Sequence, residues 1–233
     1  MRDPIYRLES VTRRYDGKVA LTIPSLALFE GRLYLLAGPN GAGKSTLLSI
    51  LAFLLLPSEG GVYYRGVKVA AGTSSAVRVR REVTLLHQSP YLFDDTVFGN
   101  IAFGLTARGT RGEELRRRVA RALDTVGLGG FERRNARLLS VGEAQRVAMA
   151  RALALSPRTL LLDEPLASVD RETAEILREV IAALPRTGTT VIMTTHGNEN
   201  LAGAASEILR IENGRIEGSP EPDRTNPSSR SMT

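Results

Sequence analysis

Short apolar runs alternate with segments of helical periodicity through most of the chain. Four runs rich in Leu, Val and Ile lack polar alternation, as expected of strands that are buried on both faces. They occupy residues 33–37, 83–86, 160–162 and 190–194. Other segments repeat apolar residues at helical spacing, and they occupy residues 47–51, 115–126, 144–155 and 176–184. Buried strands that alternate with helices indicate an α/β fold with a parallel sheet.

The N-terminal part of the chain follows a different pattern. Residues 5–11 place Tyr6, Leu8 and Val11 among polar residues, which predicts a strand, and a second β segment follows a turn and continues to Leu28. Residues 62–67 resemble a hairpin, so this part of the chain is expected to form antiparallel β structure.

Four other segments depart from the alternation of strands and helices. Residues 93–139 are helical in pattern and interrupt the alternation, which predicts an inserted helical subdomain. Residues 72–76 are small and predict a loop. Residues 208–216 predict a closing hairpin, and residues 218–233, rich in Pro, Ser, Arg and Asp, predict a disordered tail.

Composition narrows the class of protein. The length of 233 residues suits one α/β domain with a small insertion. The absence of cysteine excludes disulfides and thiolate metal sites, and two histidines are too few for a histidine-rich metal site. No stretch approaches the ~18 apolar residues of a membrane-spanning helix, and the N-terminus has no apolar signal core. A cytoplasmic protein is therefore expected.

The net charge of +6 comes mainly from arginine. Affinity for nucleic acid or for an anionic membrane surface would account for it. A charged surface with no specific partner is the simpler interpretation, because the only clusters are residues 116–118 and the set Arg78, Arg80 and Arg81. Few aromatic residues lie near them to stack on bases, which favours the simpler interpretation.

The stretch GPNGAGKST, residues 38–46, lies between a predicted buried strand and a predicted helix. Gly38, Gly43, Lys44 and Ser45 fit the pattern G-x-x-x-x-G-K-[ST] in the strand–loop–helix context that it requires. Glycines let backbone N–H groups wrap a phosphate chain at the N-terminus of a helix. Lys44 can reach the terminal phosphates, and the Ser45 hydroxyl can bind Mg²⁺. A chance glycine-rich turn would not be expected to have both flanking elements.

Four polar residues lie just beyond the ends of predicted strands. They are Gln88, Asp163, Glu164 and His196. Ligands of open parallel sheets bind beyond the carboxyl ends of the strands. Asp163 is suited to hold a metal and Glu164 to orient or deprotonate water, and the two would point in opposite directions if the strand continued. Solvent contact remains the alternative for Gln88, a structural role for His196, and an acidic turn for the two carboxylates.

Four further positions have both a structural and a functional interpretation. Tyr15 is an aromatic residue on a turn, where it could stack on a base or only pack. Ser140 and Glu143 fit a capping box that begins a helix, whose N-terminus could also face an anion. Asp170 could be the N-cap of the next helix.

These segments occur in the same order as the motifs of the ATP-binding subunit of ABC transporters, which the chain resembles from residue 5 to about 217. Residues 38–46 are similar to the Walker A loop. The other matching positions are Tyr15 for the adenine-stacking aromatic, Gln88 for the Q-loop, Ser140 and Gly142 for the signature, Asp163 and Glu164 for Walker B and its catalytic glutamate, Asp170 for the D-loop and His196 for the switch histidine.

The resemblance implies a P-loop NTPase (RecA-like) core with an N-terminal antiparallel β subdomain and an inserted α-helical subdomain at about residues 91–140. Residues 1–217 would form this ATP-binding domain. It implies ATP and Mg²⁺ as cofactors, with Glu164, His196 and Lys44 catalytic and with Ser45, Gln88 and Asp163 at the metal. The ATP-binding residues would be Tyr15, Gly38, Pro39, Asn40, Gly41, Ala42, Gly43, Lys44, Ser45, Thr46, Gln88, Ser140, Gly142 and Asp163.

Partners also follow from the resemblance. Two copies of the chain would hold two ATP molecules between them, with the Walker A loop of one facing Ser140 and Gly142 of the other. An integral membrane permease would dock at about residues 91–105, and an extracytoplasmic substrate-binding protein would act through the permease. No specific nucleic acid is expected. The chain would be cytoplasmic and peripheral on the inner face of the cell membrane.

The signature departs from the family pattern. It usually reads LSGGQ, whereas residues 139–143 read LSVGE. Val141 replaces a glycine that permits close approach to the γ-phosphate, so a branched side chain could weaken closure unless it points away. After His196, Gly197 replaces a frequent aspartate, where a smaller effect is expected.

Other members of the superfamily fit less well. Chromosome-organising ATPases have long coiled coils before the signature, translation factors have two cassettes, and P-loop kinases lack the signature helix. The absence of fused membrane helices and of an acidic, glycine-rich loop at residues 135–138 favours an importer over an exporter. The sequences of residues 50–53 and 143–147 are most similar to those of ATPases from tungstate or related oxyanion uptake systems. No residue of this chain would contact the transported molecule.

Overall fold

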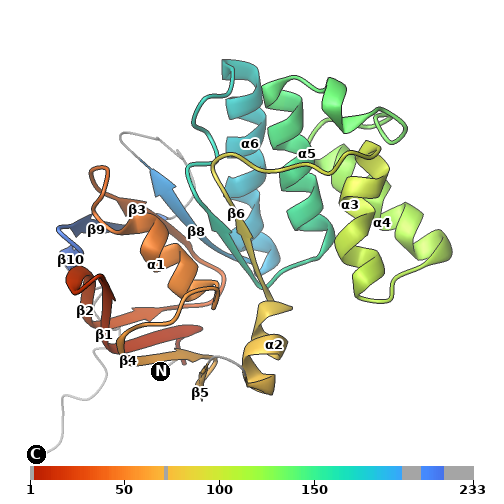
Figure 1. Ribbon diagram of the computed structural model, residues 1–233. Helices are drawn as coiled ribbons and strands as arrows, with labels where there is room; N and C mark the ends of the chain where they lie inside the picture. The colour runs from red at the N-terminus through yellow and green to blue at the C-terminus, as the bar shows by residue number, and fades with distance from the viewer. Residues whose placement is uncertain (1–2, 71–72, 196–205, 218–233) are drawn as a thin grey trace, which may run out of the picture.

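A mostly parallel sheet forms the centre of the molecule (Figure 1). The computed structural model describes residues 3–70, 73–195 and 206–217. Within them the central sheet has the order β10-β9-β3-β8-β7-β6, and only the β9–β10 hairpin pairs antiparallel. Its strands are β3 (Leu33–Ala37), β6 (Val83–Leu86), β7 (Thr159–Leu162), β8 (Thr190–Thr195), β9 (Ser206–Glu212) and β10 (Arg215–Glu217). The predicted α/β class and the closing hairpin are confirmed.

A second sheet is antiparallel and has the order β2-β1-β4-β5. Its strands are β1 (Tyr6–Tyr15), β2 (Lys18–Leu28), β4 (Glu59–Tyr64) and β5 (Val67–Lys68). Alternate residues of β1, among them Tyr6 and Leu8, are buried, which is the periodicity seen in the sequence. The predicted N-terminal antiparallel β subdomain is confirmed.

The two faces of the central sheet contact different layers. On one face, Tyr34 and Leu36 of β3 pack with the antiparallel sheet and with α1 (Lys44–Leu51). On the other face, Leu33 and Leu35 pack in a cluster with the remaining long helices. Because successive side chains of a strand point to opposite faces, both sets must be apolar, which explains the uninterrupted apolar runs.

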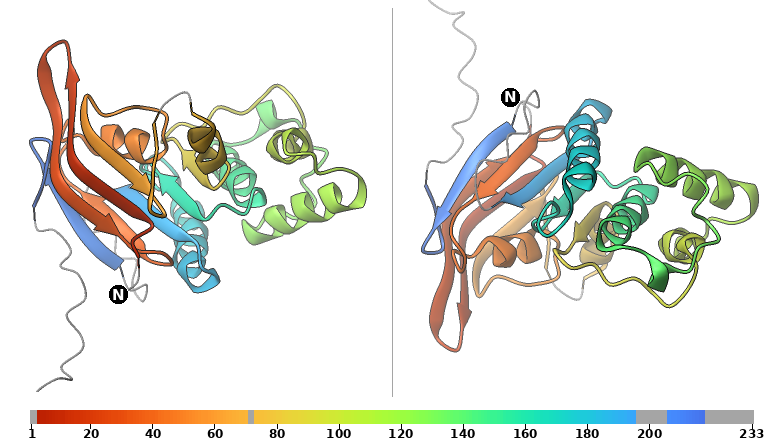
Figure 2. Two further views of the ribbon diagram at one scale, coloured as in Figure 1. Left: turned by 90° about the horizontal axis from the view of Figure 1, so that it is seen from below. Right: turned by 90° about the horizontal axis from the view of Figure 1, so that it is seen from above.

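The helices of the second face are α3 (Val97–Ala107), α4 (Gly112–Thr125), α5 (Val141–Ala154) and α6 (Arg171–Ala183). A short 3₁₀ helix, η1 (Ala136–Leu138), precedes α5, and another, η2 (Leu184–Thr187), follows α6. Both views of Figure 2 place α3 and α4 at one end of the molecule and the long β1–β2 hairpin at the other. The predicted helical insertion between β6 and β7 is confirmed.

One predicted loop is wrong. Gly72 lies outside the described residues, but residues 74–76 of this segment are helical and begin α2 (Ser74–Arg80). The Thr73 side chain accepts a hydrogen bond from the Ala76 N–H at 3.4 Å and caps this helix, and Ala76 and Val79 are buried on one face. Tertiary burial of this face decides the structure over the loop-like composition. No helix in the described ranges is long and apolar enough to cross a membrane.

Candidate functional site

The carboxyl ends of neighbouring parallel strands meet at one edge of the central sheet. The register pairs Ala37 of β3 with Thr195 of β8, and Leu162 of β7 with Leu86 of β6. The predicted phosphate loop, the acidic pair and the glutamine follow three of these strands directly. They therefore start side by side at the edge where open α/β sheets bind ligands.

The N-terminus of α1 is open to an anion. Gly43 is its N-cap residue, no side chain caps it, and its first turn contains no acidic residue. Every other α-helix in the described part of the chain has either a side-chain cap or an acidic residue in its first turn. The first N–H groups of a helix have no partner within the helix, and the helix dipole places partial positive charge there. This N-terminus is therefore suited to bind phosphate.

Lys44 holds its ammonium group inside the loop. The residue is only 5% exposed, and Nζ donates hydrogen bonds to the carbonyl oxygens of Gly38 at 2.7 Å and Pro39 at 3.1 Å. A buried ammonium group needs such partners. Both acceptors are neutral, and Lys44 has no carboxylate partner among the described residues, so its ammonium group is available to bind a phosphate oxygen in the same loop.

The loop is supported by two neighbouring segments. Gly43 has φ 102°, and a Cβ there would lie 3.0 Å from the Ala20 carbonyl oxygen of β2, so the position favours glycine. The Ala42 carbonyl accepts a hydrogen bond from the Gly214 N–H at 3.0 Å, which ties the loop to the β9–β10 turn. The exposed residues of the loop are Pro39, Asn40, Gly41 and Ser45, and Gly38 and Thr46 are half-buried.

Thr194 connects the two carboxylate residues after β7. Its hydroxyl donates to Asp163 Oδ1 at 2.8 Å and accepts from the Glu164 N–H at 2.8 Å. The Asp163 N–H donates to the Leu86 carbonyl at 2.9 Å, which fixes this turn to the end of β6. Thr194 is fully buried, so this network holds the acidic pair at the sheet edge.

The expected orientation of the acidic pair needs a correction. The strand does not continue through it, because β7 ends at Leu162. Glu164 adopts a left-handed φ of 48°, so a sharp turn separates the two side chains and strand alternation does not. A non-glycine residue held in this region is strained, and such strain often occurs at functional sites.

Three other predicted site residues are Gln88, Tyr15 and His196, and the structure describes the first two. Gln88 is exposed, two residues beyond the Leu86 carbonyl that binds the acidic turn. Tyr15 ends β1 and is 44% exposed, with the Arg13 guanidinium carbon 4.5 Å from its ring centroid. His196 lies outside the described residues.

Ser140 begins α5 with a complete capping box. Its hydroxyl accepts from the Glu143 N–H at 3.2 Å, and its own N–H donates to Glu143 Oε2 at 2.8 Å. Arg134 adds an ion pair with Glu143 at 2.9 Å. The Ser140 N–H, followed by Arg134, holds the pKa of Glu143 below its ordinary value. The predicted capping box is confirmed.

Gly142 lies where α5 and α6 converge. A Cβ at this position would lie 2.5 Å from Thr173 Oγ1 and 2.6 Å from Asp170 Oδ2. Asp170 is the N-cap of α6, as predicted, and accepts from the Thr173 N–H at 2.8 Å. The N-termini of the two helices therefore pack in direct contact through a residue without a side chain.

The α5 N-terminus and the phosphate loop of one chain lie apart. In Figure 1, α1 and the loop before it lie on one side of β8 and β6, and the start of α5 lies on the other. The described residues thus bring together Lys44, Asp163 and Glu164 at one edge, and they leave Ser140 and Gly142 in a separate place.

Comparison with known proteins identifies the family. Residues 21–167 match the ABC transporter family, which is more than half of the chain. The chain belongs to the ABC transporter family. The matched range includes the loop at residues 38–46 and the start of α5 at residues 139–143.

Two curated relatives cover almost the whole chain. The spermidine/putrescine import ATP-binding protein PotA of Mesoplasma florum is 39% identical over 95% of this chain. The tungstate uptake system ATP-binding protein TupC of Peptoclostridium acidaminophilum is 36% identical over 90% of it. The chain spans 63% of the length of PotA and 95% of the length of TupC.

A solved ABC cassette has the same fold. The ATP-binding cassette MJ0796, in a dimeric post-hydrolysis state bound to ADP and Pi, has a TM-score of 0.81 and is 30% identical. The match covers 91% of this chain and 97% of that chain. The P-loop core, the antiparallel β subdomain and the helical subdomain of this chain are therefore those of the ABC ATPase fold.

Two supporting residues of this ABC fold were not found from the sequence. Thr194 binds both Asp163 and Glu164 across some thirty positions of sequence, and Asn100, which is fully buried, binds the backbone of Phe93 and Thr96. A polar threonine at the end of a buried apolar strand could have indicated the supporting role of Thr194. An asparagine inside an apolar helix pattern could have indicated the supporting role of Asn100, because a buried amide requires hydrogen-bond partners.

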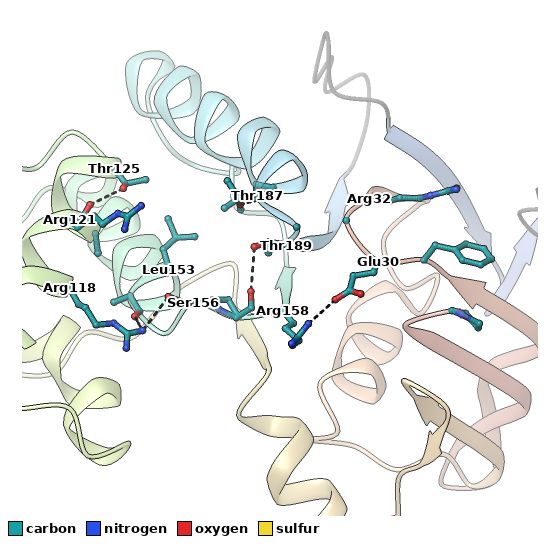
Figure 3. A pocket seen from close by; sticks show the side chains of 18 of the residues that line it. Glu30, Arg32, Arg118, Arg121, Thr125, Leu153, Ser156, Arg158, Thr187 and Thr189 are labelled. Carbon is teal, nitrogen blue, oxygen red and sulfur yellow. Dashed lines mark hydrogen bonds and ion pairs between the residues drawn. The ribbon is translucent and has the colours of Figure 1, made fainter. Parts of the chain in front are cut away.

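A large cleft of about 2780 Å³ lies at the opposite, amino edge of the ABC core (Figure 3). It separates α4 from the starts of β3, β7 and β8. Arg118 there donates to the Ala154 carbonyl at the end of α5 at 2.7 Å, and Arg158 pairs with Glu30 at 3.1 Å. Arg118 stabilises a helix C-terminus and Arg158 a carboxylate. The cleft lies at the edge of the sheet opposite the loop at residues 38–46.

Proposed function

We propose that this chain is the ATP-binding and ATP-hydrolysing subunit of an ABC importer. The observation that carries the proposal is the uncapped N-terminus of α1, with the buried Lys44 beside it and the Asp163–Thr194–Glu164 network at the same sheet edge. The N-terminus of α1, which follows β3, would bind the phosphates. The carboxylate pair follows β7, which is separated from β3 by β8 alone.

The donor set fits Mg²⁺ with ATP. Ser45, Gln88 and Asp163 offer a hydroxyl, an amide oxygen and a carboxylate, which are the oxygen ligands that Mg²⁺ prefers. No group of three histidine or acidic side chains within the described ranges could hold a metal alone. Phosphate oxygens would have to complete the shell, as is usual for Mg²⁺. The bound ion would neutralise phosphate charge during hydrolysis.

The protein groups then divide the chemistry. Lys44 and the first-turn N–H groups of α1 bind the phosphates, and Tyr15 stacks on the adenine. Glu164 accepts a proton from water as the water oxygen attacks the γ-phosphorus, and the bond to the leaving phosphate oxygen breaks to give ADP and phosphate. His196 is assigned to hold the γ-phosphate, on family resemblance alone.

A second copy completes the site. The start of α5, which contains Ser140 and Gly142, lies apart from the loop before α1, so these residues would be available to the nucleotide of another chain. The dimeric state of MJ0796 bound to ADP and Pi supports this arrangement. The apolar Val141 is 69% exposed and would lie at the junction between copies.

The permease is proposed to dock on the segment that includes residues 91–105. Tyr91, Phe93 and Phe103 form an exposed aromatic cluster, with ring centroids 6.0 Å apart for the first pair and 4.7 Å for the second. Asn100 fixes this cluster, since it accepts from the Phe93 N–H at 2.8 Å and donates to the Phe93 carbonyl at 3.1 Å. An exposed aromatic patch on a rigid base is typical of an interaction site.

We propose a small oxyanion such as tungstate or molybdate as the transported substrate. The tungstate-system relative, which matches along 95% of its length, supports this choice. The polyamine-system relative is slightly more identical and makes a cation importer the alternative. The chain would act in the cytoplasm, peripheral on the inner face of the membrane, with a substrate-binding protein reached through the permease.

Two variants test the catalytic assignment. Lys44→Ala should abolish ATP binding because the phosphate loses its cation, and Glu164→Gln should bind ATP but hydrolyse it very slowly. The matched controls are Lys68→Ala and Glu179→Gln, which change exposed residues. Phosphate release and calorimetric ATP binding are the measurements. Normal turnover by either test variant would refute the assignment.

A pull-down from detergent-solubilised native membranes tests the transport role. Recovery of a multi-span permease would support it, and the binding protein of that system could then be titrated with tungstate, molybdate and spermidine. Recovery of DNA-repair proteins or ribosomes would leave the ATP site in place and refute the transport role.

A further inference from the structure

Arg13 is placed against the ring of Tyr15 by the course of β1. Positions 11, 13 and 15 lie on one face of β1, and the register with β2 shifts between Arg13 and Arg14, where Ala20 of β2 is left without a partner. The Arg13 guanidinium carbon lies 4.5 Å from the Tyr15 ring centroid, within the range of a cation–π contact.

The same guanidinium is fixed from its other side. Its NH1 group donates to the Leu56 carbonyl at 3.2 Å, in the segment that follows α1. Its Nε is buried and has no hydrogen-bond partner within the described residues. Burial of an unpaired polar atom is unfavourable, so the position of Arg13 is not explained by hydrogen bonding alone.

The contact lies beside the phosphate loop. Arg13 pairs across the hairpin with Leu21, and a Cβ on Gly43 would lie 3.2 Å from Leu21 Cδ1. Among the described residues, Arg13 makes the one aromatic or cation contact of Tyr15, which is 44% exposed. One face of the ring is thus covered by a fixed cation and further ring surface is exposed to solvent, next to the site proposed for the phosphates.

We propose that Arg13 is a positioning residue for the nucleotide base: it orients the Tyr15 ring so that the exposed ring surface stacks on adenine. This assignment rests on the proposed nucleotide function of the chain. A ring that is already oriented loses less conformational freedom when the base arrives, which raises affinity without a new contact to the ligand. The hydrogen bond from Arg13 to the Leu56 carbonyl also links β1 to the segment that follows α1, the helix whose N-terminus would bind the phosphates.

The test separates base binding from phosphate binding. Dissociation constants for ATP and for inorganic tripolyphosphate, both with Mg²⁺, are measured by calorimetry for the intact chain. Arg13→Met keeps the aliphatic stem and removes the cation, and it should weaken ATP binding roughly two- to fivefold, the fold-change expected of an exposed cation–π contact. Tripolyphosphate binding should not change.

Three further variants complete the design. Arg13→Lys retains a cation and should recover part of the ATP affinity. Arg14→Met is the matched control, because Arg14 pairs with Glu59 at 3.4 Å on the exposed side, and it should bind ATP normally. Arg13→Met combined with Tyr15→Ala should bind ATP no more weakly than Tyr15→Ala alone, since the arginine acts through the ring.

Equal loss of ATP and tripolyphosphate affinity in Arg13→Met would show that Arg13 only fastens the hairpin, and would overturn the proposal. Unchanged ATP affinity in Arg13→Met would also overturn it, as would additive losses in the double variant. Failure of the proposed function gives a different result, because wild-type protein and Lys44→Ala would then bind tripolyphosphate equally. Melting temperatures of the nucleotide-free variants establish that each is folded.

Discussion

The contact between the N-termini of α5 and α6 gives a prediction whose size follows from the structure. Gly142→Ala would place a Cβ 2.5 Å from Thr173 Oγ1 and 2.6 Å from Asp170 Oδ2. Real Cβ atoms do not approach oxygen so closely, so one of the two side chains must move. Both belong to the cap of α6, in which Thr173 donates its N–H and its hydroxyl to the two oxygens of Asp170 at 2.8 and 3.0 Å.

Two terms set the magnitude. Overpacking at a close contact costs ~1–3 kcal/mol, and loss of an N-cap costs ~1 kcal/mol. If the side chains relax in part, the net destabilisation should be about 2 kcal/mol, which for a domain of this length lowers the melting temperature by roughly 4–8 °C. The substitution should also turn the start of α5, and with it Ser140, away from its present orientation relative to α6.

A double-mutant cycle tests the cause by thermal melting of nucleotide-free protein. Thr173→Ala removes the nearest oxygen, so Gly142→Ala should cost less in that background than in the wild type. The orientation effect is read separately as ATP-driven dimerisation of the Glu164→Gln protein. A melting temperature unchanged by Gly142→Ala, or strictly additive losses in the cycle, would refute the argument from close packing.

Three other predictions concern neighbouring features. Val141→Gly should tighten ATP-driven dimerisation of the Glu164→Gln protein in light scattering if the exposed valine obstructs closure, and no change would mean that it is accommodated. Asn100→Ala should cost ~2–4 kcal/mol in thermal unfolding, because it leaves the backbone of Phe93 unpaired, and should weaken permease recovery. Hydrogen bonds from Thr173 lower the pKa of Asp170, so its contribution to stability is present above the unfolded pKa near 4 and is lost as pH falls through the lower folded pKa. Asp170→Asn should therefore flatten the acid side of the melting-temperature profile.

The fold was predictable where burial leaves a simple pattern. The strands at 33–37 and 160–162 are apolar at every position because they are covered on both faces, so periodicity located them correctly. The helix at 74–80 was missed because its burial involves only Ala76 and Val79, and small residues before it resemble a loop. A two-residue apolar face is too short to show helical periodicity.

The candidate site was predictable to the level of the sheet edge. Parallel strands deliver the residues after them to one edge, so Gly38, Asp163 and Gln88 could be grouped from spacing alone. Side-chain orientation could not be predicted, since the left-handed turn at Glu164 depends on Thr194, a partner far along the chain. The Arg13–Tyr15 contact joins two residues on the same face of β1, so alternation places them close together but does not predict how the guanidinium lies relative to the ring.

The capping box at Ser140 does not compete with an anion for the same atoms. The Ser140 oxygen accepts the Glu143 N–H through a lone pair, and so the hydroxyl proton remains a donor on an exposed residue. The box uses only one N–H of the first turn of α5, that of Glu143, while the N–H groups of Val141 and Gly142 have no partner within the helix. Structural capping thus orients the serine and leaves its donors available, which is the condition for a phosphate on a second chain to bind at this helix end. The same geometry therefore satisfies both interpretations of the motif: it caps α5 in a single chain, and it would bind a phosphate when a second chain is present.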